Sequence, residues 1–307
     1  ETIDEECIIL GCGAPQVASV GLVDTMRVSQ DVNIFWKPAD PANVGGVSTQ
    51  HAVQNTLLRS PLNQQWWLND PDCVIVRQSL DLNVMSRSEI RSLASVAALT
   101  GSVLLDSDNL ARVKPIYLKD LRRILPALAH TAHVRKWFAS KDQQPSEFEL
   151  KHDENHFVLA TINWEEYSRS SYVDLPDHEL YHVYEFWSKK YLGVHRSRVK
   201  IPYQGPHQTI VLQCARVSDE PDIAASPFHI AGVLHENIIR TGHSLQIALS
   251  SSSKVRGNIL VNMPPRKKIT RARINGKRAR FKKVGPRVIA ISCTLNTDAS
   301  VEIDFES

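Results

Sequence analysis

The sequence lacks the patterns that mark several large classes of protein. No apolar run approaches the roughly 18 residues that a membrane-spanning helix needs. The phosphate-binding loops Gly-x-x-x-x-Gly-Lys and Gly-x-Gly-x-x-Gly are both missing. The sequence therefore predicts neither a membrane-spanning protein nor a nucleotide cofactor.

Cysteine is sparse and unpatterned. The five cysteines are odd in number, scattered along the chain and never arranged as Cys-x-x-Cys. This distribution argues against a disulfide framework and a zinc ribbon, and it favours a reducing compartment such as the cytoplasm. No metal ion or other cofactor is expected.

Neither sign of charge is in large excess. The net charge is +3 over 307 residues, which is too small for the whole protein to attract nucleic acid or a membrane surface. With 42% hydrophobic and 22% charged residues, the chain has an ordinary globular composition and room for two or three domains. The first residue is Glu1 rather than methionine and a strand-like segment follows closely, so we expect the chain to be a piece of something longer.

The first 140 residues repeat one pattern. Short apolar runs end in polar residues, and segments with helical spacing of apolar residues lie between them. The runs are 7–10, 20–24, 66–69 and 102–105, and the helical segments are 48–58, 86–97 and 117–128. Four successive strand–loop–helix units indicate parallel β/α architecture, which amounts to half of a (β/α)8 barrel. Half a barrel leaves two open strand edges, so the other half is expected elsewhere.

One helix start is marked by a capping box. Ser86 lies three residues before Glu89, which is the spacing of this motif. Ile90, Leu93 and Val96 form an apolar stripe behind it. The pattern predicts a helix that begins directly after Ser86.

The pattern changes at about residue 142. Short alternating strands separated by turn residues predict an antiparallel β-sandwich. These strands are 156–164, 172–175, 183–187, 209–213, 244–249, 257–262, 269–275, 287–292 and 301–305. Asn275-Gly276 is a type I′ hairpin signal. The expected domains are a half barrel over 1–140, a β-sandwich over 141–220 and a β-rich basic module over 221–307.

Two acids follow the apolar run at 66–69. Asp70 and Asp72 are separated by Pro71, which stops regular strand pairing and fixes the φ angle of the turn. This is how a buried strand would end if it delivered acids into a cleft. In the alternative, Asp70 caps a helix and Asp72 solvates a loop, and these residues alone leave both interpretations open.

Positive charge is concentrated near the end of the chain. Eleven lysines and arginines fall between Arg266 and Arg287, and Phe281 is the only aromatic residue among them. Proteins that bind single-stranded nucleic acid usually add several aromatic stacking platforms. A solvated basic sheet face is therefore favoured over a polyanion site, and nucleic acid is not an expected partner.

Four short motifs occur together, and they carry a resemblance to a known family. The motifs are 9–15, 21–27 with Asp31, 67–73 and 107–110. In this order and at this spacing they resemble the carboxyl half of a clan D glycoside hydrolase, and the family 36 α-galactosidases, or melibiases, in particular. The similarity runs over roughly residues 7–215 and includes the strand and turn at 186–193.

The resemblance implies retaining hydrolysis of terminal α-galactosides on a (β/α)8 barrel of which this chain holds strands 5 to 8. In the family, an acid/base aspartate lies four residues after a sugar-binding arginine. Arg27 and Asp31 match this spacing, so Asp31 is the expected general acid/base and Arg27 a substrate contact. The strand that carries the family's aspartate nucleophile precedes this part of the barrel, so the nucleophile is expected outside the chain.

The resemblance also implies the remaining substrate contacts. Cys12 and Gly13 would line the floor of the sugar site, with Asp70 and Asp72 beside them. Trp67 is a candidate for stacking on the pyranose ring, with core packing as the alternative role. The missing amino-terminal half barrel, or another copy of the chain, is the expected protein partner.

Three rival interpretations stay open. In one, the chain is a non-catalytic remnant or a carbohydrate-binding protein. A relative that transfers α-galactosyl groups would show the same motifs, since transfer differs from hydrolysis only in the acceptor that reaches the covalent intermediate. In the third interpretation, the basic module over 221–307 binds an acidic polymer.

Overall fold

The structure is a computed structural model of the chain, and it forms two units. It describes residues 7–40, 42–43, 45–78, 84–101, 103–138, 144–232, 237–249, 254–295 and 298–306. The first unit holds residues 1–150, 161–169 and 205–209, and the second holds 151–160, 170–204 and 210–307. The division into three domains at residues 140 and 220 stays a prediction.

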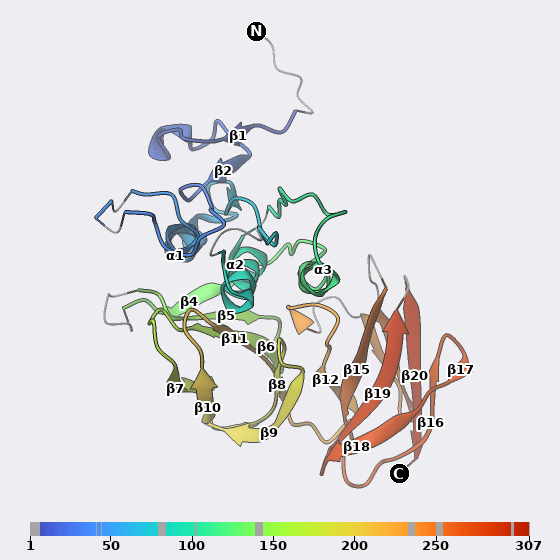
Figure 1. The fold of residues 1–307 in the computed structure, drawn as a ribbon. Helices are drawn as coiled ribbons and strands as arrows, with labels where there is room; N and C mark the ends of the chain where they lie inside the picture. The colour runs from blue at the N-terminus through green and yellow to red at the C-terminus, as the bar shows by residue number, and fades with distance from the viewer. Residues whose placement is uncertain are drawn as a thin grey trace. The chain divides into compact units, whose positions relative to one another are not determined.

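The first unit contains a small parallel sheet of order β1-β2-β3. Its strands are β1 (Leu10–Gly11), β2 (Thr25–Arg27) and β3 (Leu68–Asp70), and β1 and β2 are the blue arrows of Figure 1. The predicted parallel strands at 7–10 and 66–69 overlap β1 and β3, whereas the prediction at 20–24 is wrong, because these residues form turns and the strand begins at Thr25. The fourth predicted strand makes only an isolated parallel bridge between Cys73 and Leu105, and Ser102 lies outside the described residues.

The helices of this unit follow their sequence signals to different degrees. Helix α1 (Thr49–Arg59) and helix α2 (Arg87–Thr100) begin where predicted, and two short 3-10 helices, η1 (Val17–Ser19) and η2 (Ser60–Leu62), lie between the strands. Helix α3 runs over Pro115–Leu121, so the predicted end at residue 128 is wrong. The reason is physical: Pro115 suits the first turn of a helix, but a helix continued to 128 would carry Pro126 in its interior.

The capping box at the start of α2 is formed in full. The Glu89 amide donates to Oγ of Ser86 at 3.3 Å, and the Ser86 amide donates to Oε2 of Glu89 at 2.6 Å. Replacing Ser86 with alanine is therefore expected to lower the free energy of unfolding by about 1 kcal/mol, as measured by chemical denaturation. Ser86→Asn keeps a side-chain acceptor and is expected to lose much less; an equal loss in both variants would contradict the capping role.

A six-stranded antiparallel sheet has the order β4-β5-β6-β11-β8-β9, and β7 and β10 form a separate pair. The strands of the six-stranded sheet and of the separate pair are β4 (His133–Lys136), β5 (Glu147–Lys151), β6 (His156–Ile162), β7 (Arg169–Asp174), β8 (Leu180–Glu185), β9 (Lys190–Arg196), β10 (Arg198–Gln204) and β11 (Thr209–Arg216). The predicted antiparallel pattern after residue 142 is confirmed.

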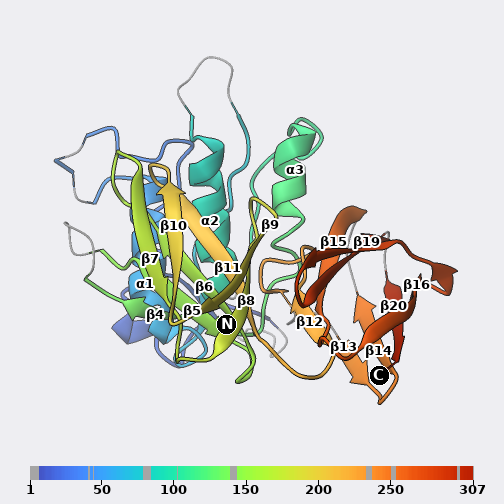
Figure 2. The same ribbon diagram turned by 90° about the horizontal axis from the view of Figure 1, so that it is seen from below.

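The end of the second unit is a β-sandwich, drawn in orange and red in Figures 1 and 2. One sheet has the order β12-β15-β19-β18 and the other β13-β14-β20-β16-β17. The strands are β12 (Asp222–Ala225), β13 (Asn237–Arg240), β14 (Ser244–Leu249), β15 (Val255–Asn262), β16 (Lys268–Ile274), β17 (Lys277–Arg278), β18 (Phe281–Gly285), β19 (Val288–Leu295) and β20 (Ala299–Glu306). Alternate residues of both sheets, such as Ile247 and Ile291, form one buried core.

The predicted hairpin in this sandwich is confirmed. Asn275 and Gly276 link β16 to β17, and Ile274 pairs with Lys277 across the turn. Both turn residues have positive φ angles, 50° and 75°, which a type I′ turn requires. None of the described helices is long and apolar enough to cross a membrane.

Candidate active site

An arginine at the end of one strand organises the candidate site. Arg27 is the last residue of β2, Asp70 is the last residue of β3, and the two pair in the parallel register. Because neighbouring parallel strands end at the same edge of a sheet, residues that follow them are brought together. The sequence predicted this placement for both residues.

The Arg27 side chain contacts three carboxylates from separate segments. Its Nε donates to Oδ2 of Asp70 at 3.0 Å, and its Nη1 lies 3.0 Å from Oδ2 of Asp72. The same Nη1 donates to Oδ1 of Asp31 at 3.2 Å. The four charged residues predicted for the site therefore form one cluster, with the cation at its centre.

The three carboxylates differ in exposure, which separates their possible roles. The side chain of Asp70 is fully buried and that of Asp72 is 8% exposed, whereas that of Asp31 is 72% exposed. Asp70 and Asp72 cannot reach solvent freely while they pair with Arg27. Asp31 is the member of the cluster that an incoming ligand can reach.

The backbone also holds the two buried acids. The Asp72 amide donates to Oδ1 of Asp70 at 2.8 Å, and the Val32 amide donates to Oδ2 of Asp72 at 2.8 Å. Asp72 itself has a φ of 73°, in the left-handed region that aspartate tolerates better than most residues. The turn after Pro71 thus fixes both carboxylates, and the helix-cap alternative for Asp70 is not what the structure shows, since Asp70 ends a strand.

The charge state of Arg27 is reinforced by its partners. Burial alone would lower the pKa of Arg27, but the hydrogen bond that it donates to Asp70 and the charges of Asp70 and Asp72 raise this pKa above its usual value. The cation is therefore permanent at any pH at which the protein is folded. It lies 3.0 Å from an oxygen of each of the two buried carboxylates.

The other predicted substrate contacts lie in different surroundings. Cys12 is exposed and near enough to Arg27 to influence its pKa, and Gly13 adopts a φ of 66° directly after it. Trp67 is only 4% exposed, packs with Met26, and donates from Nε1 to Oδ1 of Asn69 at 3.0 Å. In the described structure Trp67 thus takes the core-packing role.

The fourth motif of the resemblance serves the adjacent chain segment. Asp108 has a fully buried side chain and accepts hydrogen bonds from the amides of Val76 and Arg77. The Arg77 guanidinium pairs with it at 2.8 Å. These bonds fix the chain that leaves the Asp70–Asp72 turn.

One histidine pair has the spacing of a zinc motif, which the sequence expectation of no metal did not take into account. Residues 178–182 read His-Glu-x-x-His, a motif that binds zinc when a helix brings both histidines to one face. Here the segment runs into strand β8 instead. His178 is exposed and contacts Ser197, while His182 is buried and contacts Tyr191 and Asn262. Among the described residues, no three His, Cys, Asp or Glu side chains are grouped to hold a metal ion.

Sequence reasoning missed a second charged cluster in the first unit. His207 is 8% exposed, and its two ring nitrogens lie 2.6 Å from Oε1 of Glu89 and 3.0 Å from Oε1 of Glu166. Its ring stacks on Trp36 at 5.0 Å, and Lys37 pairs with Glu166. The cluster joins segments far apart in the sequence, so no local pattern signals it.

The acids of this cluster favour a charged imidazole. Burial alone would lower the pKa of His207, but hydrogen bonds and charges from Glu89 and Glu166 raise it. Burial alone would raise the pKa of Glu89 and of Glu166. For Glu89 the interactions with His207 and Ser86 together outweigh burial, and for Glu166 those with Lys37 and His207 do, so the pKa of each acid is lowered.

The fold of the chain is similar to that of known glycosidases, although no protein-family model matches the sequence. α-Galactosidase I from Mortierella vinacea aligns with a TM-score of 0.52 at 16% identity, over 64% of this chain and 54% of that one. A GH27 β-L-arabinopyranosidase from Geobacillus stearothermophilus aligns with a TM-score of 0.51 at 17% identity, over 67% of this chain and 49% of that one. The chain shares the fold of α-galactosidases and their relatives.

A third solved structure agrees with these two. It is an α-galactosidase candidate from Bacteroides fragilis, with a TM-score of 0.53 and 16% identity, and the match covers 68% of this chain and 47% of that one. The chain thus spans about half the length of the structures it matches. At this level of identity the likeness shows the fold alone, and the assignment to family 36 stays a prediction.

Proposed function

We propose that the chain is the carboxyl half of a clan D (β/α)8 barrel with its accessory β domain, and that it contributes half of the active site of a retaining α-galactosidase. The observation that carries this proposal is the convergence of Asp31, Asp70 and Asp72 on Arg27 at the ends of β2 and β3. In (β/α)8 enzymes, active sites are built at the carboxyl ends of the strands. A similarity of fold to α-galactosidases supports the same conclusion.

In this proposal Asp31 is the general acid/base. Its carboxylate is the exposed one, so it can reach a glycosidic oxygen, while Arg27 holds it at 3.2 Å. The buried Asp70 and Asp72 fix the guanidinium rather than touch the sugar, and Cys12 and Gly13 would line the sugar site. Trp67, buried in the core, would support the end of β3 rather than touch the sugar.

The nucleophile must come from outside this cluster. A retaining glycosidase needs a second carboxylate about 5–5.5 Å from the acid/base, free to attack the anomeric carbon. Asp70 and Asp72 are buried and bound to Arg27 and to backbone amides, so neither is free. We therefore propose that a preceding half barrel, or another subunit, supplies this aspartate.

The test is hydrolysis of an aryl α-galactoside by the chain joined to such a half barrel. Replacing Asp31 with asparagine is expected to lower kcat by roughly 100-fold or more with KM little changed, because proton transfer typically contributes that much. The stability of the variant should stay within about 1 kcal/mol of the parent, since the Arg27–Asp31 pair is exposed.

Asp24→Asn is a suitable control, because Asp24, directly before β2, accepts a hydrogen bond from the Ile9 amide, and none of its hydrogen bonds or ion pairs in the described structure involves the cluster. If Asp31→Asn keeps full kcat, Asp31 is not the acid/base. If the chain alone hydrolyses the substrate as fast as the joined form, a nucleophile is already present in it and the half-site proposal fails.

A non-catalytic sugar-binding role is the second candidate. The observation that favours it is the Arg27–Asp31 ion pair, which engages the exposed carboxylate of the cluster in a contact within the protein. Galactose binding by the joined form without any hydrolysis, and with the same affinity in Asp31→Asn, would select this role over the catalytic one.

A further inference from the structure

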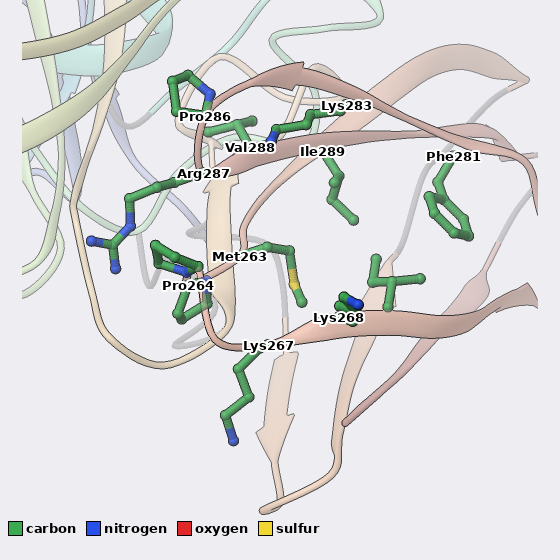
Figure 3. A pocket seen from close by; sticks show the side chains of 12 residues that line it. Met263, Pro264, Lys267, Lys268, Phe281, Lys283, Pro286, Arg287, Val288 and Ile289 are labelled. Carbon is green, nitrogen blue, oxygen red and sulfur yellow. The ribbon is translucent and has the colours of Figure 1, made fainter. Parts of the chain in front are cut away.

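A hollow of about 360 Å³ opens at one edge of the C-terminal sandwich. Figure 3 shows the side chains that line it, which come from the edge strand β18, the start of β16 and the two segments before β16 and β19. This volume lies in the range of small-molecule sites. The hollow belongs to the second unit and does not involve the Arg27 cluster.

The floor of the hollow is apolar, but its edge is not. Met263, Val288 and Ile289 are buried, whereas Phe281 is 44% exposed. Phe281 pairs with Ile291 and Lys283 pairs with Ile289 across β18 and β19. Since paired residues share a face of a sheet, Phe281 and Lys283 point toward the inside of the sandwich at its open edge.

Two of the four cations around the hollow are already occupied. Lys267 lies 3.7 Å from a Glu220 oxygen and over the Phe305 ring, and Arg287 pairs with Asp219 at 2.8 Å. Figure 3 shows both side chains extending away from Met263. They form the outer surroundings of the hollow.

The other two cations are not held in an ion pair. Within the described part of the chain, neither Lys268 nor Lys283 has an acidic partner within ion-pair distance. An inward-pointing lysine on an edge strand can protect a sheet against edge-to-edge association, which would account for Lys283. Lys268 lies opposite Glu306 in the register of β16 and β20, without forming an ion pair. Neither arrangement accounts for the exposed Phe281.

The surrounding sequence strengthens the local field. Residues 237–297 hold fourteen of the 36 lysines and arginines and none of the 33 acidic residues. Five of these cations pair with acids outside the segment, namely Arg240, Lys267, Arg271, Arg273 and Arg287. The others form no ion pair within the described part of the chain. The small net charge of the whole protein hides this separation. A strong local field of one sign concentrates ligands of the opposite sign.

We propose that this hollow binds an acidic glycan, with Lys268 and Lys283 on a uronate or sulfate group and Phe281 against the apolar face of the sugar ring. A single exposed aromatic beside two cations fits one sugar ring. A nucleic-acid strand would need a row of stacking side chains along a groove. The site is independent of the proposed catalytic function, and either can fail without the other.

Titration calorimetry of the full chain tests this site, with a size-defined oligogalacturonate and a heparin-derived oligosaccharide as separate probes. We expect at least one to bind, and Lys268→Glu/Lys283→Glu to weaken that binding by about tenfold or more, since two charge-assisted contacts are lost. The probe that binds distinguishes a uronate from a sulfate site. Lys268→Gln/Lys283→Gln is the milder form if the first variant unfolds.

The matched control is Lys277→Glu/Arg278→Glu. It makes the same charge change on β17, whose residues do not line the hollow, and it should weaken binding less than about threefold. Phe281→Ala should also weaken binding while leaving its salt dependence unchanged. The proposal is overturned if both charge variants lose affinity equally, if neither oligosaccharide binds, or if single-stranded RNA or anionic vesicles bind more tightly than both.

Discussion

Replacing Arg27 with alanine is expected to lower the free energy of unfolding of the first unit by about 3–5 kcal/mol. The reason is that Asp70 and Asp72 would stay buried without the cation that they share, and an uncompensated buried charge is costly. Urea denaturation followed by tryptophan fluorescence measures this change. The same variant should show no galactoside hydrolysis in the joined form.

A second variant separates the charge effect from lost packing. Arg27→Met/Asp70→Asn removes one charge of each sign, so it should be markedly more stable than Arg27→Ala. If Arg27→Ala loses less than about 1 kcal/mol, its ion pairs contribute no more than exposed ones do, and the description of a buried cluster would be wrong.

Replacing His207 with alanine is the other change with a large expected effect. Glu89 would lose its partner in a mostly buried position, and a loss of about 3 kcal/mol is expected. His207→Asn is the informative companion, because His207 has a φ of 54° and asparagine tolerates that conformation. It should therefore lose the ion pairs without added backbone strain.

The cluster also predicts a pH dependence of stability. The pKa of His207 is raised by folding, so its contribution is full below the pKa of an unfolded histidine and is lost as pH rises through the folded value. The pKa of Glu89 is lowered by folding, so its contribution to stability has the opposite pH dependence and is lost as pH falls through the folded value. Glu166 adds little, because it is 59% exposed and screened by solvent.

When the free energy of unfolding is measured against pH, its decrease with rising pH should thus be smaller for His207→Asn than for the parent. His133→Asn is the control, since His133 lies 3.8 Å from a Glu149 oxygen but is 64% exposed. The same decrease in His207→Asn as in the parent would contradict a charged imidazole at His207.

Local signals in the sequence were sufficient for part of this structure. The capping box predicted where α2 begins, and Asn275-Gly276 predicted a hairpin. Asp70 and Asp72 lie beside Arg27 because neighbouring parallel strands end at the same edge of a sheet. Such features depend on short-range geometry, which a single sequence contains.

Other features depend on long-range packing and could not be predicted in this way. Nothing in the sequence around Arg27 says that one guanidinium contacts three carboxylates rather than a ligand. Trp67 and Trp66 are adjacent aromatics, yet the first is buried and the second is 43% exposed. The His207 cluster needs the loop at 205–208 against the start of α2, and only the folded chain brings these together.

The most direct test of the central claim is the dependence of the Asp31→Asn variant on the leaving group. A general acid matters most when the departing oxygen is basic and least when it is already a good leaving group. In the joined form, the variant should therefore lose far more activity on an alkyl α-galactoside than on a dinitrophenyl α-galactoside. Equal losses on the two substrates would show that Asp31 does not protonate the leaving group, and the account of the site would have to be abandoned.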